Sequence, residues 1–516
     1  MLPLILAVGV LFRLFNLGYS DFQGDEVVAQ NYFWDERSFV TFLLTRTIGP
    51  GQFIISKIMN FFFLNSSRPE FYQRLPFALA GIALLIVAYT IIAKCFNKNA
   101  AIITTLLLAT SGLLIAFARI VQYQTFVMLF SLLAIYTLHL YFQQRKEKFL
   151  NISAILSSVS LLFHYDSLSF ILPIIFILAF TKSFRALFKY LIIVGAIAGS
   201  FYIPFILTPT FKTTFFFLLG ERISSGTSHD SIFYSVKLLF IYHPKELLVL
   251  YGLGFLAVWI GFMKNASKLE KTSWLLTLAL ILLRFYLQAS NPILIYSSTL
   301  ILCLLILNFL MKMTKTIPSF KNLIELWFLV SFTSYAVFMN LPLTHIYNFF
   351  IPLFILVGIE FTSLKSTKKT LTAGVAALVL VVVVSALSFN FKAFIDTSPE
   401  YPWNSKSYIF GQMPRNVAGG EEVKGIFGFP YYRNWKEIKG FIDTKGLSTY
   451  NSNEKYRLVK YYMKPHEWIY GDVRYYIYIK LPQSLSKYEK PQEIPVLEGP
   501  TFAIYENLVY KKEMTD

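Results

Sequence analysis

The chain has 516 residues, and 47 Lys and Arg against 29 Asp and Glu give a formal net charge of +18. Hydrophobic residues make up 55% of the sequence and charged residues only 15%, whereas a soluble domain usually carries about 25% charged residues. This composition excludes an ordinary cytosolic enzyme, a disordered chain and a nucleic-acid-binding scaffold. It indicates a mainly α-helical, polytopic membrane protein.

Apolar runs follow one another from the N-terminus to Phe391, separated by short polar gaps. A helix needs roughly 20 apolar residues to cross the hydrocarbon core, with about 17–25 tolerated. The runs therefore predict about thirteen transmembrane helices. Their expected ranges are 1–17, 75–95, 100–118, 124–142, 149–164, 167–182, 186–207, 246–263, 272–289, 293–311, 323–341, 346–361 and 369–391.

Alternate gaps between these segments are basic, and short basic loops stay on the cytoplasmic side. The other gaps, including the long first loop 18–74, collect nearly all the acidic residues of the membrane region. We therefore expect a multi-pass protein of the plasma (inner) membrane whose acidic gaps are extracytoplasmic. The basic gaps contain Lys94 and Lys98; Arg145, Lys146 and Lys148; Lys182, Arg185 and Lys189; Lys264, Lys268 and Lys271; Lys312, Lys315 and Lys321; and Lys365, Lys368 and Lys369.

The first loop contains an apolar stretch, residues 51–64, that is too short for a membrane span. Ile54, Ile58, Phe61 and Phe62 recur there at helical spacing. This pattern predicts an amphipathic juxtamembrane helix that lies in the outer interface. A short spanning helix is the alternative, but it would reverse the sidedness of every later loop.

The amino-acid composition changes after Phe391, where the apolar runs end and Pro, Gly, charged residues and tyrosines become frequent. Residues 1–395 hold 30 basic and 14 acidic residues (net +16), and residues 396–516 hold 17 and 15 (net +2). We predict a transmembrane domain at 1–394 and a small C-terminal domain at 395–516. Alternation over 474–480 predicts a strand, hence an α/β or β-rich domain. An odd number of spans places that domain outside the cytoplasm.

Three carboxylates, Asp21, Asp25 and Glu26, follow the first predicted helix closely. Neighbouring carboxylates at a membrane surface repel each other and are costly to desolvate unless a cation or a substrate uses them. A solvated acidic loop is the alternative explanation, and the motif alone does not separate the two.

Further segments carry a family resemblance. Residues 13–17 (RLFNL) precede Asp25-Glu26, and 49–53 (GPGQF), 71–77 (FYQRLPF) and 118–123 (ARIVQY) follow in order. Together they resemble the polyprenyl-phosphate-sugar-dependent membrane glycosyltransferases of the C-type fold, a group that includes the protein O-mannosyltransferases and the lipid A aminoarabinose transferases. The resemblance covers about residues 1–180, and the later spans agree by topology. The group's layout of spans with an outer C-terminal domain matches the layout predicted above.

The resemblance implies transfer of a sugar from a polyprenyl-phosphate donor to a lipid, glycan or protein acceptor on the extracytoplasmic side. A phosphate ester leaves as a stable anion, with a second pKa near about 6, and needs no general acid. One carboxylate acting as general base on the acceptor is sufficient, and direct attack inverts the anomeric centre. Asp25 occupies the position of the group's catalytic aspartate and is the expected base. Glu26 is expected to be a positioning partner, and Asp21 is a weaker candidate.

The departing phosphate needs cations, and the planar fork of arginine fits phosphate oxygens best. Candidates on the outer side are Arg74, Arg119, Arg222 and Arg284. Arg284 falls inside a predicted span, where an unpaired cation costs roughly 2.5–3.5 kcal/mol on insertion scales. Two alternatives stay open: Arg284 can snorkel to the headgroups, and Arg222 can form an ordinary loop ion pair.

Other outer turns add polar substrate-binding candidates: Tyr123, His164 and Asp166, and the group His345, Tyr347 and Asn348. Tyr123 could stack on a sugar or a prenyl unit, or simply belong to the interfacial aromatic belt. A lone histidine is more often a hydrogen-bonded structural residue than a ligand. No spacing is typical of zinc, and relatives differ in using a divalent ion, so no cofactor is assigned and a divalent metal ion stays open.

The sequence therefore predicts an integral-membrane glycosyltransferase, with a transporter or flippase of lipid-linked sugars as the alternative. Transporters usually show paired repeats and broken helices near the membrane midplane. No repeat is visible, and the acidic residues gather in the first outer loop. A non-catalytic subunit that kept the fold is a third possibility, which the intact Asp25-Glu26 pair disfavours. The donor sugar, the acceptor and the prenyl length are not indicated.

Overall fold

The structure is a computed structural model. It describes residues 1–23, 26–30, 38–63, 66, 68–217, 220, 231–264, 266–287, 291–314, 316–339, 343–363, 369–398, 400–401, 407–408, 411–412, 417–418, 421–422, 427–446, 449–469, 473–482 and 490–506.

Every predicted membrane segment coincides with a helix or with two consecutive helices, so the mainly α-helical fold is confirmed. Six helices in the described ranges are long and apolar enough to cross a membrane, or seven if the pair α6–α7 counts as one span. The larger total of about thirteen spans stays a prediction. The α-helices that coincide with the predicted membrane segments, whether or not they are long enough to span, are α1 (Leu2–Leu14), α5 (Pro69–Cys95), α6 (Lys98–Thr110), α7 (Gly112–Ala118), α8 (Gln124–Gln144), α9 (Glu147–Phe163), α10 (Leu168–Phe180), α11 (Phe184–Ile206), α14 (Lys245–Lys264), α15 (Lys268–Leu287), α16 (Pro292–Met313), α17 (Phe320–Phe332), α18 (Tyr347–Ser363) and α19 (Lys369–Asn390).

Shorter helices lie between the long ones. At one end of the bundle they are α2 (Glu26–Gln30), α3 (Phe39–Leu44), α4 (Gly51–Phe63), α12 (Pro209–Phe217) and α13 (Ser231–Tyr242). Two π-helical segments, η4 (Thr333–Phe338) and η6 (Phe391–Ile395), extend α17 and α19, and two 3-10 turns, η2 (Tyr165–Ser167) and η5 (Leu343–Ile346), precede α10 and α18.

The pair α6–α7 bends by 66° at a glycine. A Cβ atom at Gly112 would lie only 1.9 Å from the carbonyl oxygen of Tyr242, so only glycine allows this approach of α13. The Asn390 side chain donates to the carbonyl of Thr110 at the same break, at 2.8 Å. The bend is therefore fixed by contacts from two later helices.

The amphipathic helix predicted in the first loop is α4, so its helical conformation is confirmed. The apolar stripe Ile54, Ile58, Phe61 and Phe62 is exposed. The opposite face is buried and partly polar. The side-chain Oδ1 of Asn60 there accepts a hydrogen bond from Gln73 Nε2 on α5, at 2.6 Å. An outward apolar stripe on a surface helix fits a position in the membrane interface, which stays a prediction.

The C-terminal domain contains a five-stranded mixed sheet of order β6-β5-β7-β9-β8, so the predicted sheet region is confirmed. The predicted strand is β7. It pairs with β5 in parallel and with β9 in antiparallel orientation. The elements are β5 (Thr449–Ser452), β6 (Glu467–Trp468), β7 (Tyr475–Ile479), β8 (Leu497–Glu498) and β9 (Phe502–Glu506), with α20 (Trp435–Thr444), α21 (Tyr456–Tyr462) and the short pairs β1 (Ser407–Tyr408) with β2 (Gly411–Gln412) and β3 (Val417–Ala418) with β4 (Glu421–Glu422).

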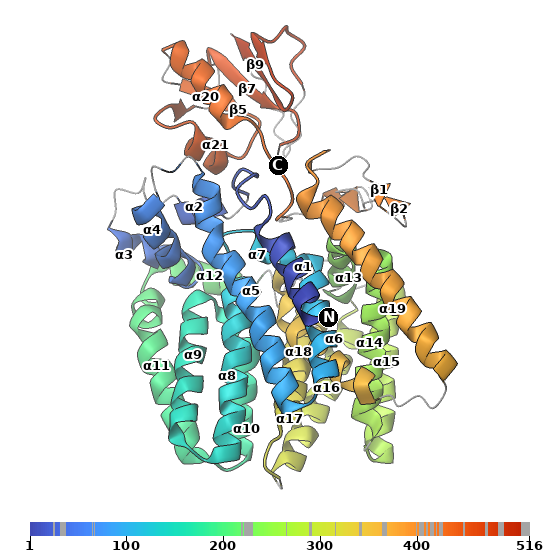
Figure 1. The fold of residues 1–516 in the computed structure, drawn as a ribbon. Helices are drawn as coiled ribbons and strands as arrows, with labels where there is room; N and C mark the ends of the chain where they lie inside the picture. The colour runs from blue at the N-terminus through green and yellow to red at the C-terminus, as the bar shows by residue number, and fades with distance from the viewer. Residues whose placement is uncertain are drawn as a thin grey trace.

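Figure 1 shows the C-terminal sheet and its helices above one end of the bundle, next to α2 and α4. The basic turn between α8 and α9 lies at the opposite end. The first loop and this basic turn thus lie at opposite ends of the bundle, whereas the side of the membrane on which each lies stays a prediction.

Candidate active site

The first loop is joined to the C-terminal domain by backbone and side-chain hydrogen bonds. Asp21 N donates to Tyr431 O at 2.7 Å, and Tyr431 N donates to Ser20 Oγ at 3.1 Å. Gln23 donates to Phe429 O at 2.5 Å and accepts from Gly428 N at 2.7 Å. The chain just before Asp25-Glu26 therefore lies against residues 428–431 of the tail.

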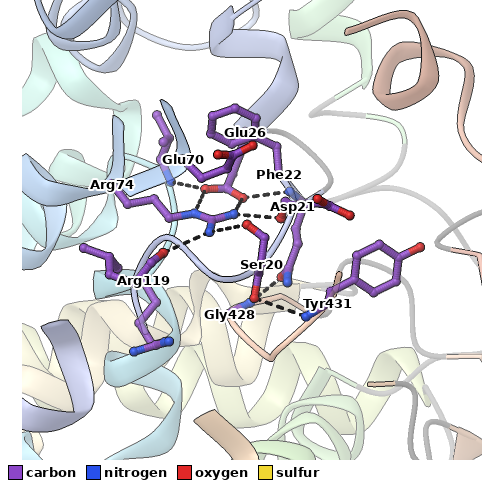
Figure 2. Close-up of polar contacts among 12 residues, drawn as sticks. Ser20, Asp21, Phe22, Glu26, Glu70, Arg74, Arg119, Gly428 and Tyr431 are labelled. Atoms are coloured by element: carbon purple, nitrogen blue, oxygen red, sulfur yellow. Dashed lines mark hydrogen bonds and ion pairs between the residues drawn. The ribbon is translucent and has the colours of Figure 1, made fainter. Parts of the chain in front are cut away.

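Glu26 is fully buried, and its carboxylate is saturated. It accepts from Arg74 Nε and Nη2, both at 2.8 Å, from Gln23 N at 2.7 Å and from Val121 N at 2.9 Å. Figure 2 shows this fork-to-fork pair at the centre of the network. Because every acceptor direction is occupied, the geometry supports a positioning role for Glu26 rather than proton transfer.

Arg74 is equally engaged. Besides Glu26, its guanidinium donates to the carbonyls of Leu17 at 3.1 Å, Ser20 at 2.8 Å and Asp21 at 2.8 Å. A guanidinium has five N–H donors, and all five are used inside the protein. The geometry gives Arg74 an internal role and leaves no donor for the predicted phosphate contact.

Asp21 belongs to the contact with the tail. Its Oδ2 accepts from Arg433 N at 2.7 Å. Burial raises the pKa of the Asp21 carboxyl well above its ordinary value, against the opposing effect of the Arg433 hydrogen bond. The Arg433 guanidinium pairs with Glu400 at 2.7 Å and lies 3.7 Å from the ring centroid of Tyr431.

Two further predicted phosphate ligands, Arg119 and Arg284, lie away from open space. Arg119 donates to the carbonyls of Phe12 and Phe15 at 2.9 and 2.8 Å, and so caps the C-terminal end of α1. Arg284 is fully buried and donates to Val337 O at 3.0 Å within η4. It therefore does not snorkel to the headgroups. Asp25 and Arg222 lie outside the described residues.

A cavity of about 430 Å³ lies at the end of the bundle that carries the first loop. Its polar wall comes from the first loop, from the turns before α8 and after α9, from η5 and from α21. Helix α2 reaches it through Val28. The polar lining includes Arg46, Gln52, Tyr123, His164, His345 and Arg457.

A compact cluster borders this cavity. The carboxylate of Asp166 lies 3.2 Å from His164 Nδ1 and 2.6 Å from His345 Nδ1. The hydroxyls of Tyr335 and Tyr347 donate to the same carboxylate, at 3.2 and 2.9 Å. Two remote turns are thus joined by one buried acid.

Neighbouring residues hold this cluster in place. The Tyr123 ring stacks on His164 with centroids 3.8 Å apart and planes at 3°. The Asn348 side chain donates to His345 O at 2.8 Å and accepts from Ser169 at 3.0 Å. The structure therefore brings together six of the predicted substrate-binding candidates: Tyr123, His164, Asp166, His345, Tyr347 and Asn348.

Sequence reasoning missed three residues at this site. Arg46 and Arg457 line the cavity, and Tyr335 bonds to Asp166. Arg46 lies in the acidic first loop, Tyr335 lies within a predicted span, and Arg457 lies in a tail without a recognisable motif. For the two arginines, the sequence offers only a positive charge in a segment predicted to lie outside the cytoplasm. That signal does not distinguish them from surface charges.

Comparisons with known proteins agree with the predicted resemblance. Residues 51–207 match the family model described as dolichyl-phosphate-mannose-protein mannosyltransferase. The match covers α4 to α11 and includes Tyr123, His164 and Asp166. The resemblance to membrane glycosyltransferases is thus confirmed over this segment. No curated protein matches the chain.

Solved structures of two glycosyltransferases are similar at low identity. ArnT from Cupriavidus metallidurans bound to undecaprenyl phosphate has 14% identity and a TM-score of 0.47, over 74% of this chain and 63% of that chain. The oligosaccharyltransferase AglB from Archaeoglobus fulgidus, in complex with an inhibitory peptide and a dolichol-phosphate, has 12% identity and a TM-score of 0.42, over 95% and 61%. The chain spans less than two thirds of the length of either protein.

Proposed function

We propose that the protein transfers a sugar from a polyprenyl-phosphate donor to a lipid, glycan or protein acceptor on the extracytoplasmic side of the membrane. The observation that carries the proposal is the polar cavity, to which the segment that matches a mannosyltransferase family model contributes Gln52, Tyr123 and His164. A volume of about 430 Å³ falls in the usual range for small-molecule sites, about 300–1,000 Å³.

The cavity wall offers the chemistry that a sugar phosphate needs. Arg46 and Arg457 supply cations for the phosphate oxygens, and arginine suits this contact because it can donate two parallel hydrogen bonds. Gln52 and Gln122 supply neutral donors and acceptors suited to sugar hydroxyls. Apolar lining from Phe53 suits the first prenyl unit.

Asp25 is the proposed general base on the acceptor hydroxyl. The residues that precede and follow it among those described, Gln23 and Glu26, are held by hydrogen bonds to the tail and to Arg74. Val28, on the helix that Glu26 begins, lines the cavity. The phosphate of the donor leaves as a stable anion, so one base suffices and direct attack inverts the anomeric centre.

The test uses the purified full chain in lipid nanodiscs, a panel of prenyl-phosphate sugars, and lipid, glycan and peptide acceptors added with each donor. Donor consumption and release of the free prenyl phosphate are measured in the wild type and in Asp25→Asn. We expect conversion of at least one donor by the wild type and much slower conversion by the variant. A donor that binds but is always recovered intact would favour the transporter alternative and contradict the proposal.

A further inference from the structure

The cluster of His164, Asp166 and His345 has the composition of a metal site. Each residue offers one ligand atom, and the three atoms lie within 4.8 Å of one another. His164 and Asp166 are 1% exposed, and the His345 side chain is 12% exposed, towards the cavity. Asp166 lies in η2, His164 directly precedes η2, and His345 lies in η5. The two turns are remote in the sequence, so their convergence depends on the tertiary fold.

A cation at His164 would replace a hydrogen bond that the cluster now makes. His164 Nδ1 accepts the backbone N–H of Asp166 at 3.0 Å, so in this tautomer the nitrogen carries a lone pair. The same nitrogen faces the Asp166 carboxylate at 3.2 Å. Two acceptors at this separation repel each other unless a proton or a metal ion lies beside them. A metal at Nδ1 would take over the lone pair that now accepts the N–H.

Two separations, which end on different oxygens of the Asp166 carboxylate, lie near those of coordinating atoms. Bonds of about 2.0–2.2 Å from one tetrahedral ion to nitrogen and oxygen place the ligand atoms roughly 3.3–3.5 Å apart. The distance from His164 Nδ1 to Asp166 is already 3.2 Å. His345 Nδ1, at 2.6 Å from the carboxylate, would move outward by less than about 1 Å to reach the same separation. Its place at the cavity edge permits that movement.

A second layer of residues orients the three ligands. Tyr335 and Tyr347 each donate a hydroxyl hydrogen bond to the Asp166 carboxylate. Tyr123 stacks on the His164 ring, and Asn348 holds the His345 backbone. Ligands in metal sites are typically fixed by such outer partners, whose loss weakens metal binding about 10–100-fold.

We infer that His164, Asp166 and His345 form a binding site for one divalent transition-metal ion, with its remaining coordination positions directed into the cavity. Two imidazoles and one carboxylate suit zinc and its first-row neighbours better than magnesium or calcium, which prefer oxygen ligands. Three protein ligands leave an open position, as in catalytic rather than structural sites. An oxygen of an anionic ligand in the cavity could occupy that position.

The inference does not rest on the proposed sugar transfer, because metal binding can be measured without any donor. The purified chain in nanodiscs is stripped with a chelator and titrated with zinc and with cobalt. Calorimetry gives the stoichiometry, and the visible absorption of bound cobalt reports imidazole and carboxylate coordination. We expect one equivalent per chain for the wild type.

Variants separate the cluster from other histidines. Asp166→Asn and His345→Ala should lose stoichiometric binding, and Tyr347→Phe should weaken the affinity about 10–100-fold. His466→Ala is the control, because His466 pairs with Asp443 in the C-terminal domain, away from the cluster. Thermal unfolding checks that each variant is folded, and His345→Ala, at the cavity edge, is the least disruptive. Absence of stoichiometric uptake by the folded wild type, or equal uptake by His345→Ala, would overturn the inference.

Discussion

Two polar regions at the same end of the bundle differ in whether their side chains line the cavity. In the Glu26–Arg74 network, every acceptor direction of the carboxylate and all five guanidinium N–H groups are engaged internally. In the cavity, Arg46, His164 and His345 are part of the wall, and the two histidines also contact the Asp166 carboxylate. Buried, saturated charges mainly fix the fold, whereas charges that face a cavity can bind a ligand.

The saturated network also explains how the tail is attached. Arg74, on α5, donates to the backbone carbonyls of Ser20 and Asp21 in the first loop. The loop meets residues 428–433 of the tail at this point. The cavity receives Arg457 from the same domain. The C-terminal domain therefore contributes both to holding the first loop and to the wall of the proposed donor site.

The largest effect is expected from Asp25→Asn, which cannot accept the acceptor's proton. Turnover should fall about 10²–10⁴-fold, the usual contribution of a general base. Donor binding should persist, since a carboxylate does not attract phosphate. Turnover and donor binding are measured on the same preparation, and near-normal transfer by the variant would contradict the assignment of the base.

The next largest effect concerns the saturated network. Arg74→Leu leaves the Glu26 carboxylate buried without its cation, and breaking a buried pair in this way costs about 3–5 kcal/mol. We expect a clearly lower unfolding temperature in nanodiscs. The double variant Glu26→Leu with Arg74→Leu should recover part of the loss, because no charge is stranded. An Arg74→Leu protein as stable as the wild type would show that the network is dispensable.

The cavity arginines should affect donor binding more than stability. Arg46→Ala and Arg457→Ala each remove charge-assisted hydrogen bonds worth about 1.5–3 kcal/mol, or roughly 10–150-fold in Kd. Arg145→Ala is the matched control, because Arg145 lies in the exposed turn between α8 and α9 at the other end of the bundle. Donor affinity equal to wild type in both cavity variants would remove these arginines from the site.

The smallest effect concerns pH. Burial raises the pKa of Asp21, so the folded protein binds this proton at pH values where the unfolded chain has released it. Stability then falls as the pH rises through the window from the unfolded to the folded pKa. Asp21→Asn should flatten this part of the dependence of unfolding temperature on pH, whereas the exposed Glu467→Gln should leave it unchanged. An unchanged slope in Asp21→Asn would contradict the burial effect.

Much of the fold could be predicted from the sequence, because apolar length and periodicity determine where helices form in a membrane protein. The helix at Gly51–Phe63 and the strand at Tyr475–Ile479 follow from the same patterns. The sequence places the turns that carry His164 and His345 on the same side, but their meeting at Asp166 is a finding of the structure. The division at residue 394 and the sidedness of the loops stay predictions.

Other features depend on contacts that no sequence pattern records. Arg74 and Arg46 look alike in the first loop, yet one is saturated by three backbone carbonyls and a carboxylate while the other lines the cavity. The pairing of residue 21 with residue 431 runs through the backbone, which carries no side-chain signal. Tyr335 reaches Asp166 from a π-helical segment, whose register differs from the predicted helical period.

The most direct test of the account is a crossed measurement on Arg74→Leu and Arg457→Ala. Unfolding temperature and Kd for a prenyl-phosphate sugar are determined for both variants and the wild type in the same nanodiscs, with binding measured below the unfolding range of each. We predict that Arg74→Leu lowers the unfolding temperature strongly while the folded fraction retains its donor affinity, and that Arg457→Ala weakens donor binding with little change in unfolding temperature. The reverse pattern, with donor affinity lost in Arg74→Leu and retained in Arg457→Ala, would contradict it.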